Sequence, residues 1–166
     1  GGDQSLTWQA LRQPDGAVTP ELLAIRQAVR QGRLIVAGTS AGTAVQAGGQ
    51  WQGRPVPMIS NGTSAHALLH GALAAPAPAA GCQQNNSCPP GVAEQQLTYQ
   101  PLGGLGLFPF GLLDTHFSER GREFRLIRLL SDTGSRFGFG VDEASALLVG
   151  FDNSANQRAR LSVVGA

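Results

Sequence analysis

The sequence predicts an α/β fold, and three observations lead to that class. Its 166 residues are enough for one domain with a sizeable core. The hydrophobic fraction of 42% is typical of a globular chain and not of a disordered one. Short apolar runs of strand type alternate with amphipathic helical patterns along the chain, and this alternation is characteristic of layered α/β proteins.

The first part of the chain predicts two helices joined by a turn. Residues 4–13 have apolar side chains at helical spacing, and residues 13–16 contain the Pro-Asp-Gly chemistry of a turn. A second helix begins after Thr19, a favoured N-cap, with Pro20 at its first position, and it ends at Gly32. The apolar positions are Leu6, Trp8 and Leu11 in the first helix and Leu22, Ile25 and Val29 in the second.

A buried strand followed by a glycine turn is predicted next. Residues 33–37 are mainly apolar and follow a helix directly, as the strands of a parallel sheet do. The segment 38–42, Gly-Thr-Ser-Ala-Gly, then forms a turn, and residues 43–47 continue as a helix of small residues.

The second half of the chain predicts another helix and four more strands. The composition of residues 71–91 shifts to Ala, Pro, Gln and Asn, which indicates a long loop or insertion within one domain. An amphipathic helix is predicted over residues 120–130, with Phe124, Ile127 and Leu130 on its apolar face. The predicted strands cover residues 112–114, 137–141, 146–151 and 160–164, the last of them at a sheet edge.

Composition and charge argue against two classes of function. Twelve Lys+Arg and eleven Asp+Glu residues give a net charge of +1, and charged residues make up only 14% of the chain. A nucleic-acid-binding protein is expected to carry a basic patch or stripe, so we expect no nucleic-acid partner. The sequence contains no run of about 18 apolar residues, so no membrane-spanning helix and no membrane partner are expected.

Ser40 lies between two glycines, after a predicted strand and before a predicted helix, which is the pattern of a nucleophile elbow. The turn is tight, so its flanking residues must be small, and the serine hydroxyl is presented at the carboxyl end of the strand. The helix N-terminus favours negative charge there, and the Ala41 N–H is placed to donate to an oxyanion. The alternative is a glycine-rich turn that binds a phosphate or no ligand.

A serine nucleophile needs a base, and His116 is the best placed of the three histidines. It follows a predicted strand, so it lies at the same carboxyl edge of the sheet as Ser40. His66 and His70 are interpreted instead as one face of a short helix or part of a polar loop. Three arginines follow His116 closely, namely Arg120, Arg122 and Arg125. They are interpreted either as a solvated helix face or as residues that bind a carboxylate.

Glu143 is the candidate that orients the imidazole, because it follows the predicted strand 137–141 at the same edge. Its neighbour Asp142 remains an alternative for that role. The chain order serine, histidine, acid differs from that of the α/β-hydrolases, in which the acid precedes the histidine. Another family of serine hydrolases is therefore favoured, and a cysteine amidotransferase is set aside because serine occupies the elbow.

Cys82 and Cys88 lie close together in a polar segment, which predicts a small disulfide. A disulfide implies an oxidising compartment, so we expect a secreted or periplasmic protein. The alternative is two free thiols in the cytoplasm. No second pair of Cys or His residues at zinc spacing accompanies them, so no metal site is expected.

Four motifs in this order resemble the cyanophycinases, serine peptidases related to the aspartyl dipeptidase called peptidase E. The motifs are residues 1–4, residues 38–42, residues 114–122 with Arg125 and Leu126, and residues 138–143 with Ala146 and Leu147. The resemblance implies a mostly parallel sheet flanked by helices, like that of class I glutamine amidotransferases. It also implies cleavage of aspartyl peptides through an acyl-enzyme without any cofactor; cyanophycin itself is polyaspartate with arginine on each side chain.

The resemblance implies roles for individual residues. Its catalytic set is Ser40 as nucleophile, His116 as general base and Glu143 as orienting acid, and its oxyanion set is Gly2, Asp3 and Ala41. Its substrate-binding set is Gln4, Asp114, Thr115, Arg120, Arg122 and Arg125. Thr115 stands where cyanophycinases usually have Gln, which leaves the polymer specificity open.

Residues 1–166 are interpreted as a portion of one catalytic domain, because family members have further strands upstream of the first motif. A strand such as 33–37 needs hydrogen-bonded neighbours on both sides, since unpaired buried backbone groups are costly. We therefore expect that cleavage made Gly1 and that the upstream polypeptide of the same precursor stays bound as a second chain. Autocleavage by Ser40 and assembly into a homo-oligomer are further hypotheses. The opposing hypothesis is a catalytically silent domain that binds an acidic ligand.

Overall fold

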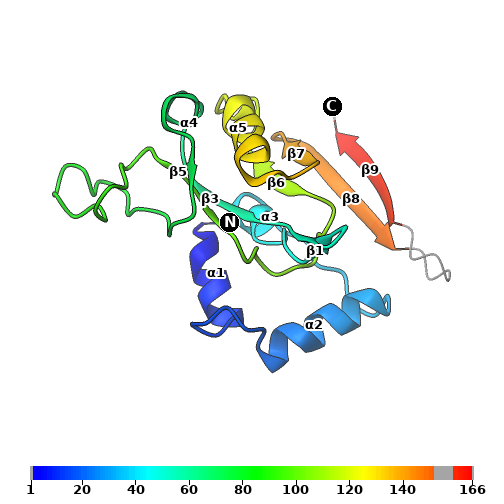
Figure 1. Cartoon of the computed structure of the whole chain (residues 1–166). Helices are drawn as coiled ribbons and strands as arrows, with labels where there is room; N and C mark the ends of the chain where they lie inside the picture. Colours follow the sequence, from blue (N-terminus) through cyan, green and yellow to red (C-terminus); the bar gives the residue numbers. More distant parts are fainter. Residues whose placement is uncertain (1, 152–158, 166) are drawn as a thin grey trace.

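The structure is a computed structural model, and it describes residues 2–151 and 159–165. Helices and strands alternate along the chain, as Figure 1 shows. The helices are α1 (Gln4–Leu11), α2 (Pro20–Arg30), α3 (Ala41–Ala44), α4 (Ser64–His70) and α5 (Glu123–Thr133). The strands are β1 (Gln50–Trp51), β2 (Arg54–Pro55), β3 (Met58–Asn61), β4 (Ala72–Leu73), β5 (Leu97–Gln100), β6 (Leu112–Thr115), β7 (Gly138–Val141), β8 (Ser145–Phe151) and β9 (Ala159–Gly165).

The strands form several small sheets rather than one large one. β5 lies between β3 and β4, antiparallel to β3 and parallel to β4, while β6 pairs in parallel with β7. β8 and β9 form an antiparallel hairpin, as do β1 and β2. The α/β class predicted from the sequence is therefore confirmed. The mostly parallel sheet is not found, because among the described residues only two strand pairs are parallel.

The main core lies where α4 and α5 cover the strands. In Figure 1 these two helices lie above β3, β5 and β6, and α1 and α2 lie below them. The buried residues of this core are Ala44, Ile59, Ala67, Leu97, Leu112, Leu126 and Leu129. Ala44 of α3 and Leu112 of β6 belong to the same cluster, so the elements that carry the predicted nucleophile and base pack on one core.

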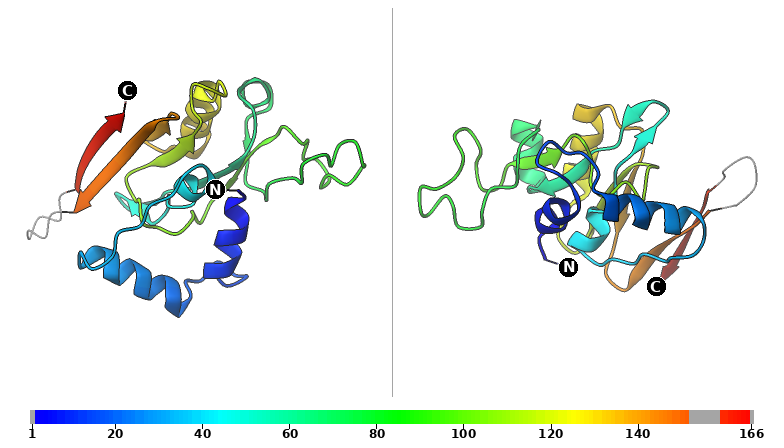
Figure 2. Two further views of the ribbon diagram at one scale, coloured as in Figure 1. Left: turned by 180° about the vertical axis from the view of Figure 1, so that it is seen from behind. Right: turned by 90° about the horizontal axis from the view of Figure 1, so that it is seen from below.

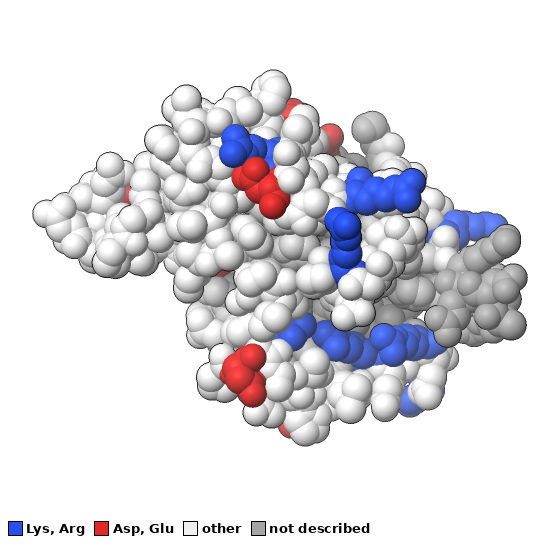
Figure 3. Space-filling view, in the orientation of Figure 1, with Lys and Arg blue, Asp and Glu red and all other residues white. Residues whose placement is uncertain are grey.

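The two N-terminal helices form where the sequence predicts them. The Thr19 hydroxyl caps α2 by accepting a hydrogen bond from the Leu22 N–H at 3.3 Å, and Asp3 caps α1 in the same way through the Ser5 N–H. Figure 3 shows a row of cationic side chains over α2, which carries Arg26 and Arg30. The Arg26 guanidinium donates to the Leu105 carbonyl oxygen at 2.6 Å, which ties α2 to the loop before β6.

The prediction of a buried strand at residues 33–37 is wrong for this chain. The segment has no strand partner among the described residues, and it runs exposed between α2 and α3. The Ile35 side chain is 92% exposed. An apolar segment becomes a strand only when neighbours satisfy its backbone groups, and no described strand pairs with this one.

Two helices differ from their prediction. The helix after the elbow begins at Ala41, earlier than the predicted residue 43, and has only four residues. In α5 two of the three predicted apolar residues point outward, since Phe124 is 54% and Ile127 is 58% exposed, whereas Leu130 is partly buried against the main core. The buried face instead carries Arg125 with Leu126 and Leu129, because Arg125 meets a buried carboxylate beneath the helix.

The predicted insertion extends away from the body of the molecule, as both views of Figure 2 show for the green loop between β4 and β5. Residues 72–73 form β4, which pairs with β5, and the rest of the segment 71–91 consists of turns and irregular structure. A disulfide joins Cys82 to Cys88 within it. β3, β5 and the β1–β2 hairpin were not predicted from the sequence, because their strands are only two to four residues long.

No helix within the described residues is long and apolar enough to span a membrane.

Candidate active site

Ser40 occupies a sharp turn at the N-terminus of α3. Its backbone has φ 52° and ψ −121°, a conformation that a non-glycine residue adopts only under strain. Hydrogen bonds hold the turn closed: the Gly42 N–H donates to the Thr39 carbonyl, and the Thr43 hydroxyl donates to the Gly38 carbonyl at 2.6 Å. The closed turn places Ser40 directly before α3, where its hydroxyl meets the His116 ring.

Glycine is required at residue 38 for a steric reason. A Cβ atom there would lie 2.1 Å from the Gly42 carbonyl oxygen, and backbone atoms cannot move aside as a flexible side chain can. The two ends of the elbow therefore approach each other more closely than any side chain permits.

Gly38→Ala is expected to open the elbow and to cost about 1–3 kcal/mol of stability, the usual penalty of overpacking. Labelling of Ser40 by a serine-directed probe should fall by about tenfold or more, because the hydroxyl moves away from its base. Gly150→Ala is the matched control, since a Cβ there meets no atom within 4 Å. Parent-like labelling of the Gly38 variant would contradict this account.

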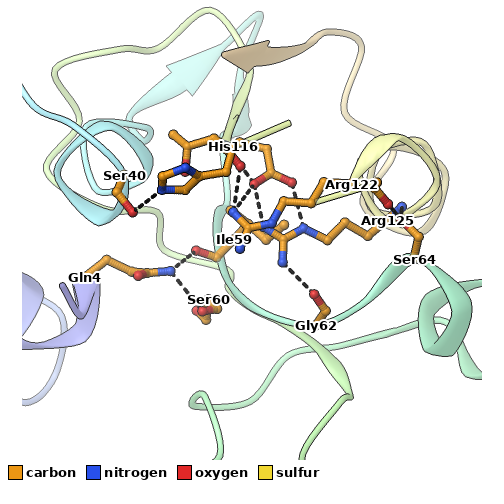
Figure 4. A network of polar contacts seen from close by, with 12 residues as sticks. Gln4, Ser40, Ile59, Ser60, Gly62, Ser64, His116, Arg122 and Arg125 are labelled. Carbon is orange, nitrogen blue, oxygen red and sulfur yellow. Dashed lines mark hydrogen bonds and ion pairs between the residues drawn. The ribbon is translucent and has the colours of Figure 1, made fainter. Parts of the chain in front are cut away.

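His116 joins Ser40 to Glu143 in a continuous hydrogen-bonded chain. The His116 Nε2 atom lies 2.9 Å from the Ser40 Oγ atom, and its Nδ1 atom lies 2.8 Å from the Glu143 Oε1 atom. Figure 4 shows the imidazole of His116 pointing directly at Ser40. Three side chains that are far apart in the sequence, from α3, the end of β6 and the turn after β7, thus form the arrangement of a nucleophile, a base and an orienting acid.

Strained backbone occurs at two members of this arrangement and directly beside the third. Besides Ser40, His116 has φ 48° and Ala144, which follows Glu143, has φ 58°. Non-glycine residues with positive φ are uncommon and concentrate at functional sites, where the surrounding structure enforces them.

Glu143 rather than Asp142 contacts the imidazole, so the choice between the two acids is decided by the geometry of the turn. Asp142 accepts hydrogen bonds from the Ser118 N–H at 2.7 Å and from the Ser118 hydroxyl at 2.8 Å. The backbone hydrogen bond from Ser118 is the main cause that lowers the pKa of Asp142. Asp142 therefore serves the loop after His116 and not the histidine ring.

A cleft of about 800 Å³ opens beside the hydrogen-bonded chain. Ser40, Thr115, His116 and Glu143 line it, so four residues of the predicted site face one space. Residues 144–148, which lead into β8, also line the cleft. No arginine of the described chain lines this cleft, so the expected carboxylate-binding role of Arg120, Arg122 and Arg125 has no direct counterpart in its walls.

Arg125 lies beneath the site as half of a buried ion pair. Its Nε atom donates to the Asp114 Oδ2 atom at 2.7 Å, and its Nη2 atom donates to the other carboxylate oxygen. The two residues are only 5% and 1% exposed. Because Asp114 is in β6, two residues before His116, this bidentate pair fixes α5 to the strand that ends at the histidine.

Arg122 extends the same cluster toward the site. Its Nη1 atom donates to the Thr115 carbonyl oxygen at 2.6 Å, and Figure 4 shows its side chain lying alongside that of Arg125. Burial and the positive charges of Arg125 and Arg120 lower the pKa of Arg122 to about 10, although Asp114 acts in the opposite direction. Arg122 remains charged at neutral pH and supports the residue next to His116.

The remaining predicted substrate-binding residues are placed differently. Gln4 does not line the cleft; its amide donates to the carbonyl oxygens of Ile59 and Ser60, which ties α1 to β3 (Figure 4). The Arg120 side chain is exposed, on the loop that follows His116.

The predicted oxyanion donors come from two elements that lie close together. Ala41 is the first residue of α3, so its N–H has no acceptor within the helix. Asp3 caps α1, and all views of Figures 1 and 2 place the start of α1 beside α3. The two backbone segments that carry the predicted donors therefore lie beside each other.

The two other histidines do not join the site. His66 and His70 lie one turn apart on α4, with ring centroids 4.2 Å apart, and they face the disulfide loop. Burial, followed by the neighbouring His70, lowers the pKa of His66. No group of three or more His, Cys, Asp or Glu residues in the described chain has the arrangement of a metal site.

Comparison with known proteins connects this geometry to a family. The chain is 30% identical over 143 residues to a cyanophycinase of Geminocystis herdmanii. The aligned residues make up 86% of this chain and 38% of that protein. It is 32% identical over 125 residues to cyanophycinases of Trichormus variabilis and of a Nostoc species. Here the aligned residues make up 75% of this chain and 30% of each relative. The chain thus spans about a third of the length of these curated relatives. No family model matches it.

Proposed function

Because this chain belongs to a cyanophycinase-like family, we propose that it carries the catalytic residues of a serine peptidase that hydrolyses amide bonds in aspartyl peptides. One observation above all supports this proposal. It is the hydrogen-bonded chain from Ser40 through His116 to Glu143 at the wall of an open cleft.

In the proposed reaction, the Ser40 hydroxyl attacks a substrate carbonyl carbon while the His116 Nε2 atom takes its proton. Glu143 accepts a hydrogen bond from the Nδ1–H, which holds the correct tautomer and stabilises the imidazolium. The Ala41 N–H and an N–H of Gly2 or Asp3 would bind the oxyanion. The proton then passes from His116 to the leaving amine, and water releases the acyl-enzyme in a second cycle of the same steps.

Aspartyl character of the substrate is proposed from the family resemblance. The described walls of the cleft contribute no cation, and Arg122 and Arg125 are engaged with internal acceptors. We therefore assign these two arginines a role in holding β6 and its histidine. Arg120, exposed beside the histidine loop, is the candidate that contacts a substrate carboxylate directly.

A fluorophosphonate probe tests the enzymatic proposal against the alternative of a silent binding domain. The parent protein should be labelled on Ser40, and Ser40→Ala should abolish the label. Absence of labelling in well-folded parent protein would favour the binding domain. Hydrolysis of an aspartyl peptide should also exceed that of its asparaginyl counterpart, and equal rates would exclude carboxylate recognition.

We also propose that polypeptide from the same precursor completes the sheet beside residues 33–37. The support is the exposed apolar segment itself, whose Ile35 would otherwise lie in water. The proposed cut before Gly1 lies outside the described residues. Expression of the precursor with Ser40→Ala tests self-processing: if that variant is still cut after purification, Ser40 is not the processing nucleophile.

An exported, oxidising compartment is proposed from the Cys82–Cys88 disulfide. Protein purified from its native source without reductant should be lighter than the form with two free thiols by the mass of two hydrogen atoms. Replacing both cysteines with serine should cost about 2 kcal/mol, because the bridge closes a short loop. Free thiols in the native protein would point to the cytoplasm instead.

A further inference from the structure

The orienting acid is not held in place by packing. The Glu143 side chain is 61% exposed, and it stands on a turn whose next residue, Ala144, has a strained positive φ. A carboxylate on an exposed, strained turn needs other contacts to keep a 2.8 Å distance to the His116 ring. Those contacts determine whether the hydrogen-bonded chain persists in solution.

The contacts come from the loop that follows His116. The Glu143 N–H donates to the Glu119 Oε1 atom at 2.5 Å. In return, the Ser118 N–H and hydroxyl donate to the Asp142 Oδ1 atom at 2.7 Å and 2.8 Å. Each loop thus supplies one carboxylate that accepts hydrogen bonds from the other loop. Both contacts lie close in sequence to His116 and Glu143.

We infer that Glu119 and Asp142 form a reciprocal clamp that sets the distance and angle between His116 and Glu143. The inference rests on the proposed function, since the clamp acts only through those two residues. Neither clamp carboxylate contacts the imidazole in the structure, so both are positioning residues and not catalytic ones. Glu119 lies within the motif at residues 114–122, but the motif assigns it no role, because that role depends on a backbone N–H 24 residues away.

The clamp predicts an asymmetry between two variants of one residue. Glu119→Ala removes the acceptor of the Glu143 N–H, whereas Glu119→Gln keeps a side-chain oxygen at the same place. The alanine variant should slow the maximal labelling rate of Ser40 by about tenfold, which corresponds to about 1.4 kcal/mol in the transition state. Apparent probe affinity should not change, since the clamp residues hold the acid and do not bind the probe.

The experiment compares Glu119→Ala, Glu119→Gln and Asp142→Ala with the parent protein and with Glu21→Ala, an exposed glutamate of α2. Labelling by a fluorophosphonate is resolved into apparent affinity and maximal rate. The far-downfield proton signal of an imidazole N–H bound to a carboxylate is followed by NMR in ¹⁵N-histidine protein. We expect slow labelling and a broadened signal in the two alanine variants, and near-parent behaviour in Glu119→Gln and Glu21→Ala.

Two results would overturn the clamp: parent-like labelling in both alanine variants, or a Glu119→Gln variant as slow as Glu119→Ala. If the parent itself is not labelled, the proposed function fails. The NMR signal then still reports on the clamp independently. Asp142→Ala tests the same idea from the opposite loop, so the inference stays falsifiable even if one variant fails to fold.

Discussion

Ser40→Ala and His116→Ala should each reduce amide hydrolysis by about 10⁴- to 10⁶-fold, the loss that follows removal of a nucleophile or its base. The Ser40 Oγ atom lies 2.9 Å from the His116 Nε2 atom, so neither group can act without the other. The double variant should therefore be no slower than either single variant, because the two losses are not additive. Steady-state hydrolysis of an aspartyl peptide, extended to single-turnover conditions, measures these rates.

Glu143→Gln should cost less than either change, since the base survives and only its orientation and charge stabilisation are impaired. Melting temperatures near that of the parent are required for all variants, so that the losses report chemistry and not unfolding. Near-normal turnover in His116→Ala would rule out His116 as the base.

Asp114→Ala should be the most destabilising polar substitution in the molecule. It removes the partner of the buried Arg125 guanidinium and leaves an uncompensated charge in the core, which typically costs about 3–5 kcal/mol. The loss should appear as a lower midpoint in urea denaturation with an unchanged slope. Activity should also fall, because Asp114 belongs to the strand that ends at His116.

Arg128→Ala is the matched control for this prediction. Arg128 also lies on α5 and pairs with an acid, Asp132, at 2.9 Å, but this pair is partly exposed. An exposed pair four residues apart on a helix contributes about 0.3–0.5 kcal/mol. A similar loss for Asp114→Ala and Arg128→Ala would show that the buried pair does not hold α5 to β6.

Features that depend on neighbouring residues could be predicted from the sequence. The elbow around Ser40 follows from the close approach of Gly38 to Gly42, only four residues away. The start of α2 follows from a cap that joins Thr19 to Leu22. The position of His116 at the end of a strand could also be predicted from the residues around it. The family resemblance likewise rests on short motifs in their order along the chain.

Three other features were decided by the tertiary structure alone. Glu143 rather than Asp142 meets the histidine, because the turn after β7 directs one carboxylate to the ring and the other to Ser118. The buried face of α5 carries Leu126 and Leu129, which pack in the main core, and Arg125, which pairs with Asp114 of β6. Residues 33–37 remain outside every sheet, because none of the described strands forms a ladder of hydrogen bonds with them.

The physical reason for this division is the range of the interactions. Steric limits at a tight turn and helix caps act between residues a few positions apart, so a short window of sequence contains both partners. The choice of a helix face, of a strand partner or of one acid among two neighbours is set by contacts between segments that are distant along the chain. Those contacts exist only once the chain has folded, and for residues 33–37 the proposed partner comes from polypeptide outside this chain.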